Sequence, residues 1–363
     1  MATPRALCIH AGPTARAHLR EFGLRPSDIQ VVAAAAGGPK GLVLLHLDAF
    51  LFGHWLPQGR HRLDLVGASI GAWRMAAACT RQPVAALQRL GHDYIHERYG
   101  AVDAVLPGAE VVSRQFRQTL RKHFPPDAVA DLRAHPNWRL HIVASRGRGL
   151  LARAGRPQML TGFAAAVGLN ALSRRLLDLQ LQRVWFSSDG CAPDWMVQPQ
   201  PDLQTVTAPL RQDNFEDVLL ASCSIPFWLQ PVQDIAGAPA GPYWDGGLTD
   251  YHMHLPFHRI GGGLALVPHF QPQLVPGWLD KPWPHRHRAT PFLDNAIVLS
   301  PSPEWLRLLP GGKIPDRSDF KRYVHAPQER ERLWSAALKA SEQLAQEWAE
   351  CVHQPSIEAS PLP

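Results

Sequence analysis

The sequence predicts an α/β protein whose sheet is mainly parallel and carries helices on its faces. Two observations predict it. Residues 29–36 form a short apolar run that ends at glycines, and a helical pattern of apolar residues follows over 41–55. Residues 62–66 form a second such run, which enters a tight turn before the alanine-rich helical segment 70–79. This order of strand, loop, helix, strand, turn and helix is typical of a parallel sheet.

Further elements follow from the same periodicities. Strands are predicted at 140–144, 184–187, 264–267 and 296–299, and helices at 83–99, 110–123 and 164–181. Segments 230–244 and 270–291 are rich in proline, glycine and tryptophan and have no periodicity, so we expect ordered loops over the site.

The C-terminal part has a different character. Over 329–353, Leu333, Ala337, Leu344, Trp348 and Val352 fall roughly along one face, which predicts an amphipathic helix. We expect this helix to pack on the rest of the chain. Contact with lipid or a second copy is an alternative, because such helices bind interfaces when their apolar face is free.

Composition narrows the function classes. The net charge of +6 suits binding to an anionic surface such as phospholipid headgroups. The sequence has no run of Lys and Arg, so nucleic-acid binding is not expected. The five cysteines are odd in number and contain no C-x-x-C pair, which favours a reducing, cytoplasmic location without disulfides. No secretory signal is recognised, and the longest apolar stretch, 42–56, is interrupted and too short to span a bilayer. Peripheral membrane contact is left open.

A Gly-x-Ser-x-Gly turn marks the first candidate site residue. Gly67-Ala68-Ser69-Ile70-Gly71 lies between a predicted strand and a predicted helix, which is where a nucleophilic serine is raised on a strained turn. Gly67 and Gly71 support this turn by allowing close backbone packing. Ser69 is therefore the predicted nucleophile, and an ordinary turn with a surface serine is the alternative.

A glycine-rich loop about thirty residues upstream offers backbone donors. The adjacent Gly37 and Gly38 leave their N–H groups unobstructed at the start of a helix, where negative charge is favoured. We expect them to form an oxyanion hole, supported by Lys40 and Gly41. Lys40 either holds the loop or attracts a phosphate, or is an ordinary solvated lysine. The glycine spacing is not that of a P-loop.

Asp245 is the predicted proton acceptor. It follows Tyr243-Trp244, whose rings shield it from water and raise its basicity, and it precedes Gly246 and Gly247, which allow a close approach to the serine turn. Without a function, the same Asp-Gly pair is simply hairpin chemistry.

Together these blocks resemble the patatin-like phospholipase family. The glycine-rich loop ending in Lys-Gly, the Gly-x-Ser-x-Gly turn and the Asp-Gly-Gly stand in the family's order, and residues 221–226 (ASCSIP) with Pro231-Val232 resemble a fourth block. The resemblance covers about residues 31–256. It implies a three-layer α/β/α fold and a lipid acyl hydrolase with a Ser69–Asp245 dyad. It also implies one hydrolase domain over 1–326, with 327–363 as a C-terminal helix and tail packed on it.

The predicted reaction is hydrolysis of a carboxylic ester, in a phospholipid or a related acyl ester, through an acyl-serine and without metal or cofactor. Acyl transfer to another alcohol uses the same residues, and the oligomeric state is not predicted. We expect aromatic residues of the loops to line an acyl pocket: Phe227, Trp228, Trp244, Trp278 and Trp283.

Departures from the family keep alternatives open. Pro39 stands where the family has a third glycine and has no N–H to donate, so a catalytically weak lipid-binding or scaffold protein is one alternative. His252, His254 and His258 follow Asp245 closely. We expect them to be structural or interface histidines, and a metal-dependent hydrolase or a histidine that completes a triad are the alternatives.

Overall fold

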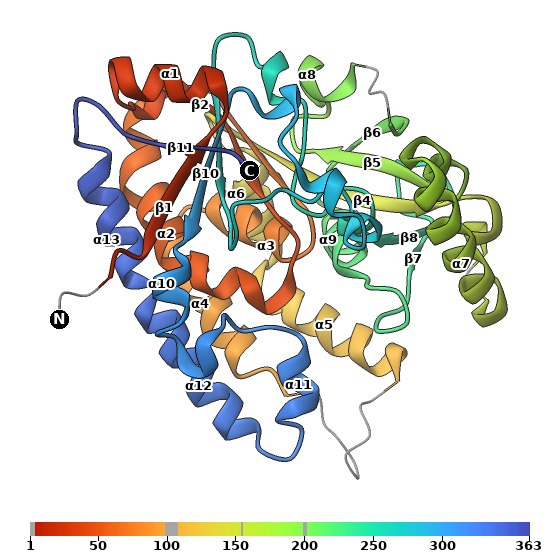
Figure 1. Cartoon of the computed structure of the whole chain (residues 1–363). Coiled ribbons are helices and arrows are strands. Elements are labelled where there is room, and N and C mark those ends of the chain that lie inside the picture. Colours follow the sequence, from red (N-terminus) through yellow and green to blue (C-terminus); the bar gives the residue numbers. More distant parts are fainter. Residues whose placement is uncertain (1–3, 99–107, 154, 199–201) are drawn as a thin grey trace.

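A single mixed sheet forms the centre of the molecule (Figure 1). The computed structural model describes residues 4–98, 108–153, 155–198 and 202–363. The strand order is β11-β1-β10-β9-β2-β3-β4-β5-β6, with β8 attached to β4 and β7 to β8. The strands are β1 Leu7–Ala11, β2 Ile29–Ala34, β3 Leu63–Gly67, β4 Trp138–Gly147, β5 Leu181–Ser187, β6 Thr205–Pro209, β7 Val232–Gln233, β8 Pro242–Asp245, β9 Leu264–Pro268, β10 Ala296–Pro301 and β11 Ser360–Pro361.

The middle of the sheet is parallel. Neighbouring strands from β10 through β9, β2 and β3 to β4 all run in the same direction. Antiparallel pairs occur where β1 meets β10 and where β5 and β8 meet β4. All six strands predicted from sequence are present, and the predicted α/β class with a mainly parallel sheet is confirmed.

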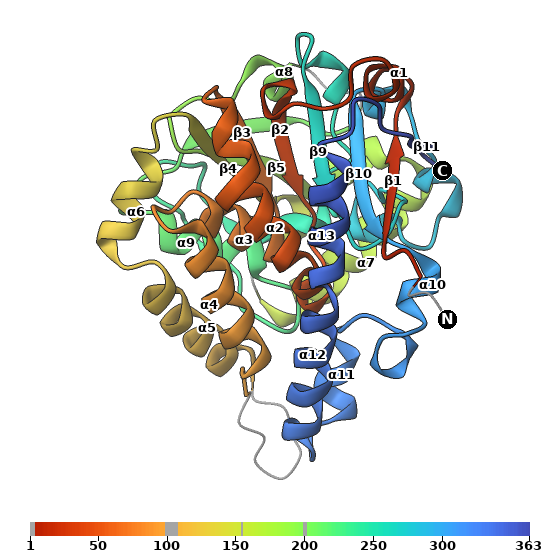
Figure 2. The ribbon, with the colours of Figure 1, turned by 90° about the vertical axis from the view of Figure 1, so that its left-hand side faces the viewer.

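Helices cover one face of the sheet most completely (Figure 2). The helices are α1 Pro13–Phe22, α2 Leu45–Phe50, α3 Ile70–Ala78, α4 Pro83–Ile95, α5 Ala109–His123, α6 Pro126–Arg133, α7 Arg156–Leu172, α8 Asp194–Val197, α9 Phe215–Cys223, α10 Pro303–Leu306, α11 Ser318–Arg322, α12 Pro327–Ala340 and α13 Glu342–Cys351. Val32 and Leu65 point into the core on this face, whereas Val31 and Val66 point to the other, as the period of two requires. There the sheet is covered largely by loop segments.

Two predicted helices differ from the structure. Over the predicted helix 164–181, α7 ends at Leu172 because Ser173 is extended; a 3₁₀ turn follows, and Leu181 already begins β5. The predicted helix 41–55 is α2 flanked by a 3₁₀ segment and a π-helical turn. Helix α4 ends at Ile95, and the predicted end at residue 99 lies outside the described residues. The predicted loop 230–244 contains β7 and β8.

The single C-terminal helix predicted from sequence is two helices, α12 and α13, joined at Ser341. Their apolar face is packed against the domain: Trp334 and Trp348 are almost completely buried, and Trp348 meets Trp55 edge to face. The Glu347 carboxylate accepts the backbone N–H groups of residues 6 and 7. This face is therefore not free for lipid. The division into 1–326 and 327–363 stays a prediction.

Among the helices that the structure describes, none is long and apolar enough to span a bilayer.

Candidate active site

Ser69 lies at the corner between β3 and α3 with a left-handed backbone, at φ +55° and ψ −128°. Such a conformation is costly for a residue with a side chain and persists only where the surroundings enforce it. Gly67 and Gly71 enforce it here. A Cβ on Gly71 would collide with the carbonyl oxygen of Ala34 in β2, and one on Gly67 would lie 2.6 Å from the Gly71 carbonyl carbon.

This packing gives a first prediction. Gly71→Ala should destabilise the fold by roughly 2 kcal/mol or more, because the added methyl group has no room beside β2. Gly168→Ala in α7 is the matched control. Its Cβ would meet nothing within 4 Å, so this variant should be as stable as the parent or up to about 1 kcal/mol more stable. Urea unfolding of both variants measures the difference, and equal midpoints would contradict the close approach.

The hydroxyl of Ser69 donates a hydrogen bond to Asp245 Oδ2 at 2.9 Å, although the two residues are 176 positions apart. Both side chains are nearly buried, with 5% and 7% exposure. The other carboxylate oxygen, Oδ1, accepts the N–H of Gly247 at 2.7 Å. Asp245 is thus held by its own glycine turn with one oxygen directed at the serine.

Strand pairing brings the carboxylate to the serine. Asp245 ends β8, which pairs with β4 so that Asp245 lies opposite Ala144. The Ser145 hydroxyl donates to the Asp245 carbonyl oxygen at 2.9 Å, and the Asp245 N–H donates to the carbonyl of Ser224 at 2.9 Å. A Cβ on Gly246 would collide with the carbonyl oxygen of Val143, so only glycine fits there.

The fourth sequence block, residues 221–226, lies beside both Ser69 and Asp245. Ser222 at the end of α9 accepts the backbone N–H of Ser69 through its hydroxyl oxygen at 2.9 Å. The same block therefore contacts the backbone of both Ser69 and Asp245. Sequence reasoning identified the block but not these contacts, which depend on where α9 lies.

Burial raises the pKa of Asp245 to about 6. The Gly247 N–H, the Arg317 guanidinium, the Ser69 hydroxyl and the Lys281 ammonium act in the opposite direction. Burial, together with the nearby Lys40 and Arg317, lowers the pKa of Lys281 to about 8, and the Asp245 carboxylate acts in the opposite direction. The carboxylate is thus more basic than an ordinary aspartate, although two cations, Arg317 and Lys281, act on it.

The glycine-rich loop borders Ser69 with free donors. Gly37 and Gly38 have φ values of +153° and +58°. Neither N–H group forms a hydrogen bond with any other residue in the described ranges. Lys40 Nζ lies 4.9 Å from the ring centroid of Phe270, and burial lowers its pKa.

Two cavities meet at Ser69. The larger, of about 690 Å³, is bordered by Ser69, Asp245 and Gly37 and has a mainly apolar wall. The smaller, of about 460 Å³, is bordered by Ser69, Gly38 and polar side chains of α4 and α5.

The aromatic residues expected in the acyl pocket are divided. Phe227 and Trp278 line the larger cavity, whereas Trp228 lines the smaller one. Trp244 is completely buried, and Trp283 borders neither cavity.

Arg317 is a site residue that the sequence did not reveal. It precedes α11, borders both cavities, and places Nη2 about 3.4 Å from where a Cβ on Gly38 would lie. The arginine stands in no motif and is 72 residues beyond Asp245. Only the folded chain brings it to the glycine-rich loop.

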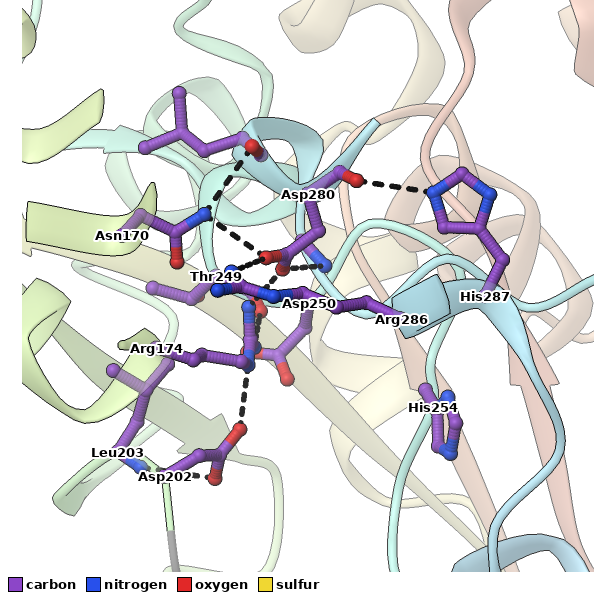
Figure 3. A network of polar contacts seen from close by, with 12 residues as sticks. Asn170, Arg174, Asp202, Leu203, Thr249, Asp250, His254, Asp280, Arg286 and His287 are labelled. Carbon is purple, nitrogen blue, oxygen red and sulfur yellow. Dashed lines mark hydrogen bonds and ion pairs between the residues drawn. The ribbon is translucent and has the colours of Figure 1, made fainter. Parts of the chain in front are cut away.

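A network of polar contacts joins the apolar wall of the larger cavity to the loop that follows Asp245 (Figure 3). The Arg174 guanidinium contacts Asp202, Asp280 and the carbonyl oxygen of Thr249. The buried Asp280 carboxylate also accepts hydrogen bonds from Asn170 of α7 and from Arg286. Helix α7, the turn that carries Trp278 and the chain after Asp245 are therefore joined through the ion pair of Arg174 and Asp280.

The three candidate histidines do not converge. His252 accepts the N–H of Val275, His254 contacts Thr290 Oγ1 at 2.8 Å, and His258 is exposed and stacks on Phe292. Burial lowers the pKa of His254 to about 4. Within the described ranges, no histidine is hydrogen-bonded to Ser69 or Asp245, and no three His, Cys, Asp or Glu side chains are grouped as metal ligands. Among the residues that the structure describes, these three histidines are therefore not brought together as a metal site or a triad.

Fold and site define an α/β protein in which a strained serine and a buried aspartate form a pair at a strand-to-helix corner. No protein-family model matches the chain, and no curated protein matches it.

Two solved structures show a distant similarity. VipD from Legionella pneumophila is 12% identical, with a TM-score of 0.33, over 66% of this chain and 50% of that one. Human GIVD cytosolic phospholipase A2 is 11% identical, with a TM-score of 0.30, over 98% of this chain and 66% of that one. This chain therefore matches only half to about two thirds of their lengths. Neither similarity is close enough to support an argument about function.

Proposed function

We propose that this protein is a lipid acyl hydrolase that cleaves a carboxylic ester through an acyl-serine on Ser69. The observation that carries the proposal is the 2.9 Å hydrogen bond between the Ser69 hydroxyl and the Asp245 carboxylate, beside a mainly apolar cavity of about 690 Å³. The resemblance of four sequence blocks to patatin-like phospholipases supports the same reaction and a fatty acyl chain as the group that enters the cavity.

In the proposed mechanism, Asp245 Oδ2 takes the proton of Ser69 as Oγ attacks the carbonyl carbon of the ester. The tetrahedral intermediate collapses, the bond to the alcohol oxygen breaks, and that oxygen takes the proton from Asp245. Water then gives a proton to Asp245, attacks the acyl-serine and releases the carboxylic acid as Ser69 recovers its proton. No step needs a metal or a cofactor.

The oxyanion formed in each half-reaction requires donors. We assign this role to the free N–H groups of Gly37 and Gly38, which border the two cavities at Ser69. Pro39 offers no N–H, and the Arg317 guanidinium beside this loop supplies positive charge at the same place. The inactive scaffold alternative rests on Pro39 alone.

A fluorophosphonate probe tests the proposal. It should form a covalent adduct that peptide mapping places on Ser69, and turnover of a p-nitrophenyl acyl ester should fall in proportion to labelling. An adduct on another residue, or none, would overturn the assignment. Labelling of Ser69 without turnover would favour the catalytically weak alternative.

The pH profile gives a second prediction. Asp245 must be ionised to accept a proton, and burial raises its pKa to about 6. We therefore expect kcat/KM to be constant above roughly pH 7 and to fall about tenfold for each pH unit below 6. Stopped-flow turnover of a soluble ester between pH 4.5 and 8 measures this. A profile that is flat down to pH 4.5 would show that Asp245 is not the base.

A further inference from the structure

Exposed apolar side chains gather around the mouth of the larger cavity. Four of them border it while being 46–62% exposed, and we call these the cavity rim: Leu160, Val167, Phe227 and Trp278. Leu160 and Val167 stand on α7, Phe227 packs against Phe163 of α7, and the turn of Trp278 contacts α7. Single exposed apolar residues are normal, but four around one opening indicate an interaction site.

The apolar surface extends beyond the rim. Leu172 at the end of α7 is 79% exposed, and Leu150 and Leu179 are exposed on turns that contact α7. Among the described residues, seven of the eleven exposed large hydrophobic side chains thus lie on α7 or beside it. The C-terminal helices lie on the opposite side of the molecule from α7 (Figures 1 and 2).

Positive charge surrounds this surface. Arg153, Arg156 and Arg175 are exposed on α7 or within a few residues of its ends, and none forms an ion pair with another described residue. The neighbouring carboxylates are already paired: Asp178 with Arg148, and Asp202 with Arg174.

We propose that the cavity rim and its three arginines form a docking surface for an anionic phospholipid bilayer. Apolar side chains at the surface enter the boundary between headgroups and acyl chains, and arginines beside them contact the lipid phosphates. The cavity then opens toward the layer that contains the acyl chains. Docking requires neither Ser69 nor Asp245, so this inference goes beyond the proposed function and does not depend on it.

Vesicle co-sedimentation tests the surface with Ser69→Ala protein, so that binding is measured without turnover. The protein should bind phosphatidylglycerol vesicles at low salt and bind phosphatidylcholine vesicles at least tenfold more weakly. Leu160→Glu should weaken binding roughly tenfold or more, because a leucine no longer enters the apolar layer. Leu308→Glu is the matched control, since Leu308 is 63% exposed and Leu160 62%, and it should bind like the parent.

A charge reversal tests the role of the arginines in vesicle binding. Arg156→Glu should weaken binding about fivefold or more and reduce its salt dependence, whereas Arg20→Glu on α1, with the same change of charge, should not. Circular dichroism should show that all variants are folded.

Three results would overturn the proposal: no binding to anionic vesicles, equal losses in Leu160→Glu and Leu308→Glu, or a dimer in gel filtration that Leu160→Glu dissociates. The last would mean that a second copy covers the rim. If the vesicles are bound but the parent protein, with Ser69 intact, hydrolyses no ester, the proposed function is refuted and the docking surface stands.

Discussion

Ser69→Ala should lower turnover of a soluble acyl ester by roughly 10⁴-fold, because the acyl-serine cannot form. Some acceleration over the uncatalysed reaction should remain, since the proposed oxyanion donors, the N–H groups of Gly37 and Gly38, are unchanged in this variant. Alanine keeps the Cβ of serine and leaves intact the hydrogen bond from the backbone N–H of residue 69 to Ser222. The loss should therefore arise from chemistry and not from unfolding.

Ser318→Ala is the matched control for this prediction. Ser318 borders the same cavity but is exposed, and its hydroxyl is hydrogen-bonded to Asp316 and not to Ser69 or Asp245. Its turnover should stay within about twofold of the parent. Turnover by Ser69→Ala above a tenth of the parent rate would exclude an acyl-serine on this residue.

Asp245→Asn should abolish turnover and at the same time raise stability at neutral pH. The folded state holds this carboxyl at a pKa of about 6, above its usual value of 3.8, because ionisation in a buried site is unfavourable. A raised pKa in an acid means that folding favours the protonated form, so this group lowers stability as pH rises from about 4 to 6. The difference between the two pKa values lowers the free energy of unfolding by about 3 kcal/mol at pH 7.

Asparagine is neutral at every pH and should relieve most of that cost. Thermal unfolding should show Asp245→Asn melting several degrees above the parent at pH 7.5 and close to it at pH 4. Asp48→Asn is the contrasting control. Asp48 is buried against Arg74 through two hydrogen bonds, so its loss should destabilise by about 3–5 kcal/mol. A lower melting temperature for Asp245→Asn at pH 7.5 would contradict the unfavourable burial.

The sequence allowed the central parts of the candidate site to be predicted because their chemistry is local. A Cβ would collide with a backbone atom at Gly67, Gly71 and Gly246. Only glycine fits at such positions, so the site can be recognised from its glycines in the sequence. The direct contact between Ser69 and Asp245 depends on β8 pairing with β4, which the short strand β8 does not reveal by its own periodicity. The pair was predicted through the resemblance of the motifs.

Other features had no local signal. Arg317 and Ser145 are single residues whose roles follow from tertiary neighbours. The helical pattern continues through 164–181, but α7 ends at Leu172, where Ser173 is extended, and β5 begins at Leu181 to pair with β4. The sequence predicts the apolar face of 329–353, but the contact between Trp348 and Trp55 could not be predicted because the two residues are far apart in the chain.

The position of Ser69 between two cavities has a consequence for the fate of the acyl group in the proposed reaction. In the proposed mechanism, an acyl chain in the larger cavity leaves the smaller one, which includes polar side chains of α4 and α5, open to the molecule that attacks next. Water and small alcohols would then compete there to attack the acyl-serine, giving a free acid or a new ester and releasing Ser69 in either case. The ratio of glycerol ester to free carboxylic acid, measured with added glycerol, would show whether the smaller cavity favours an alcohol or water.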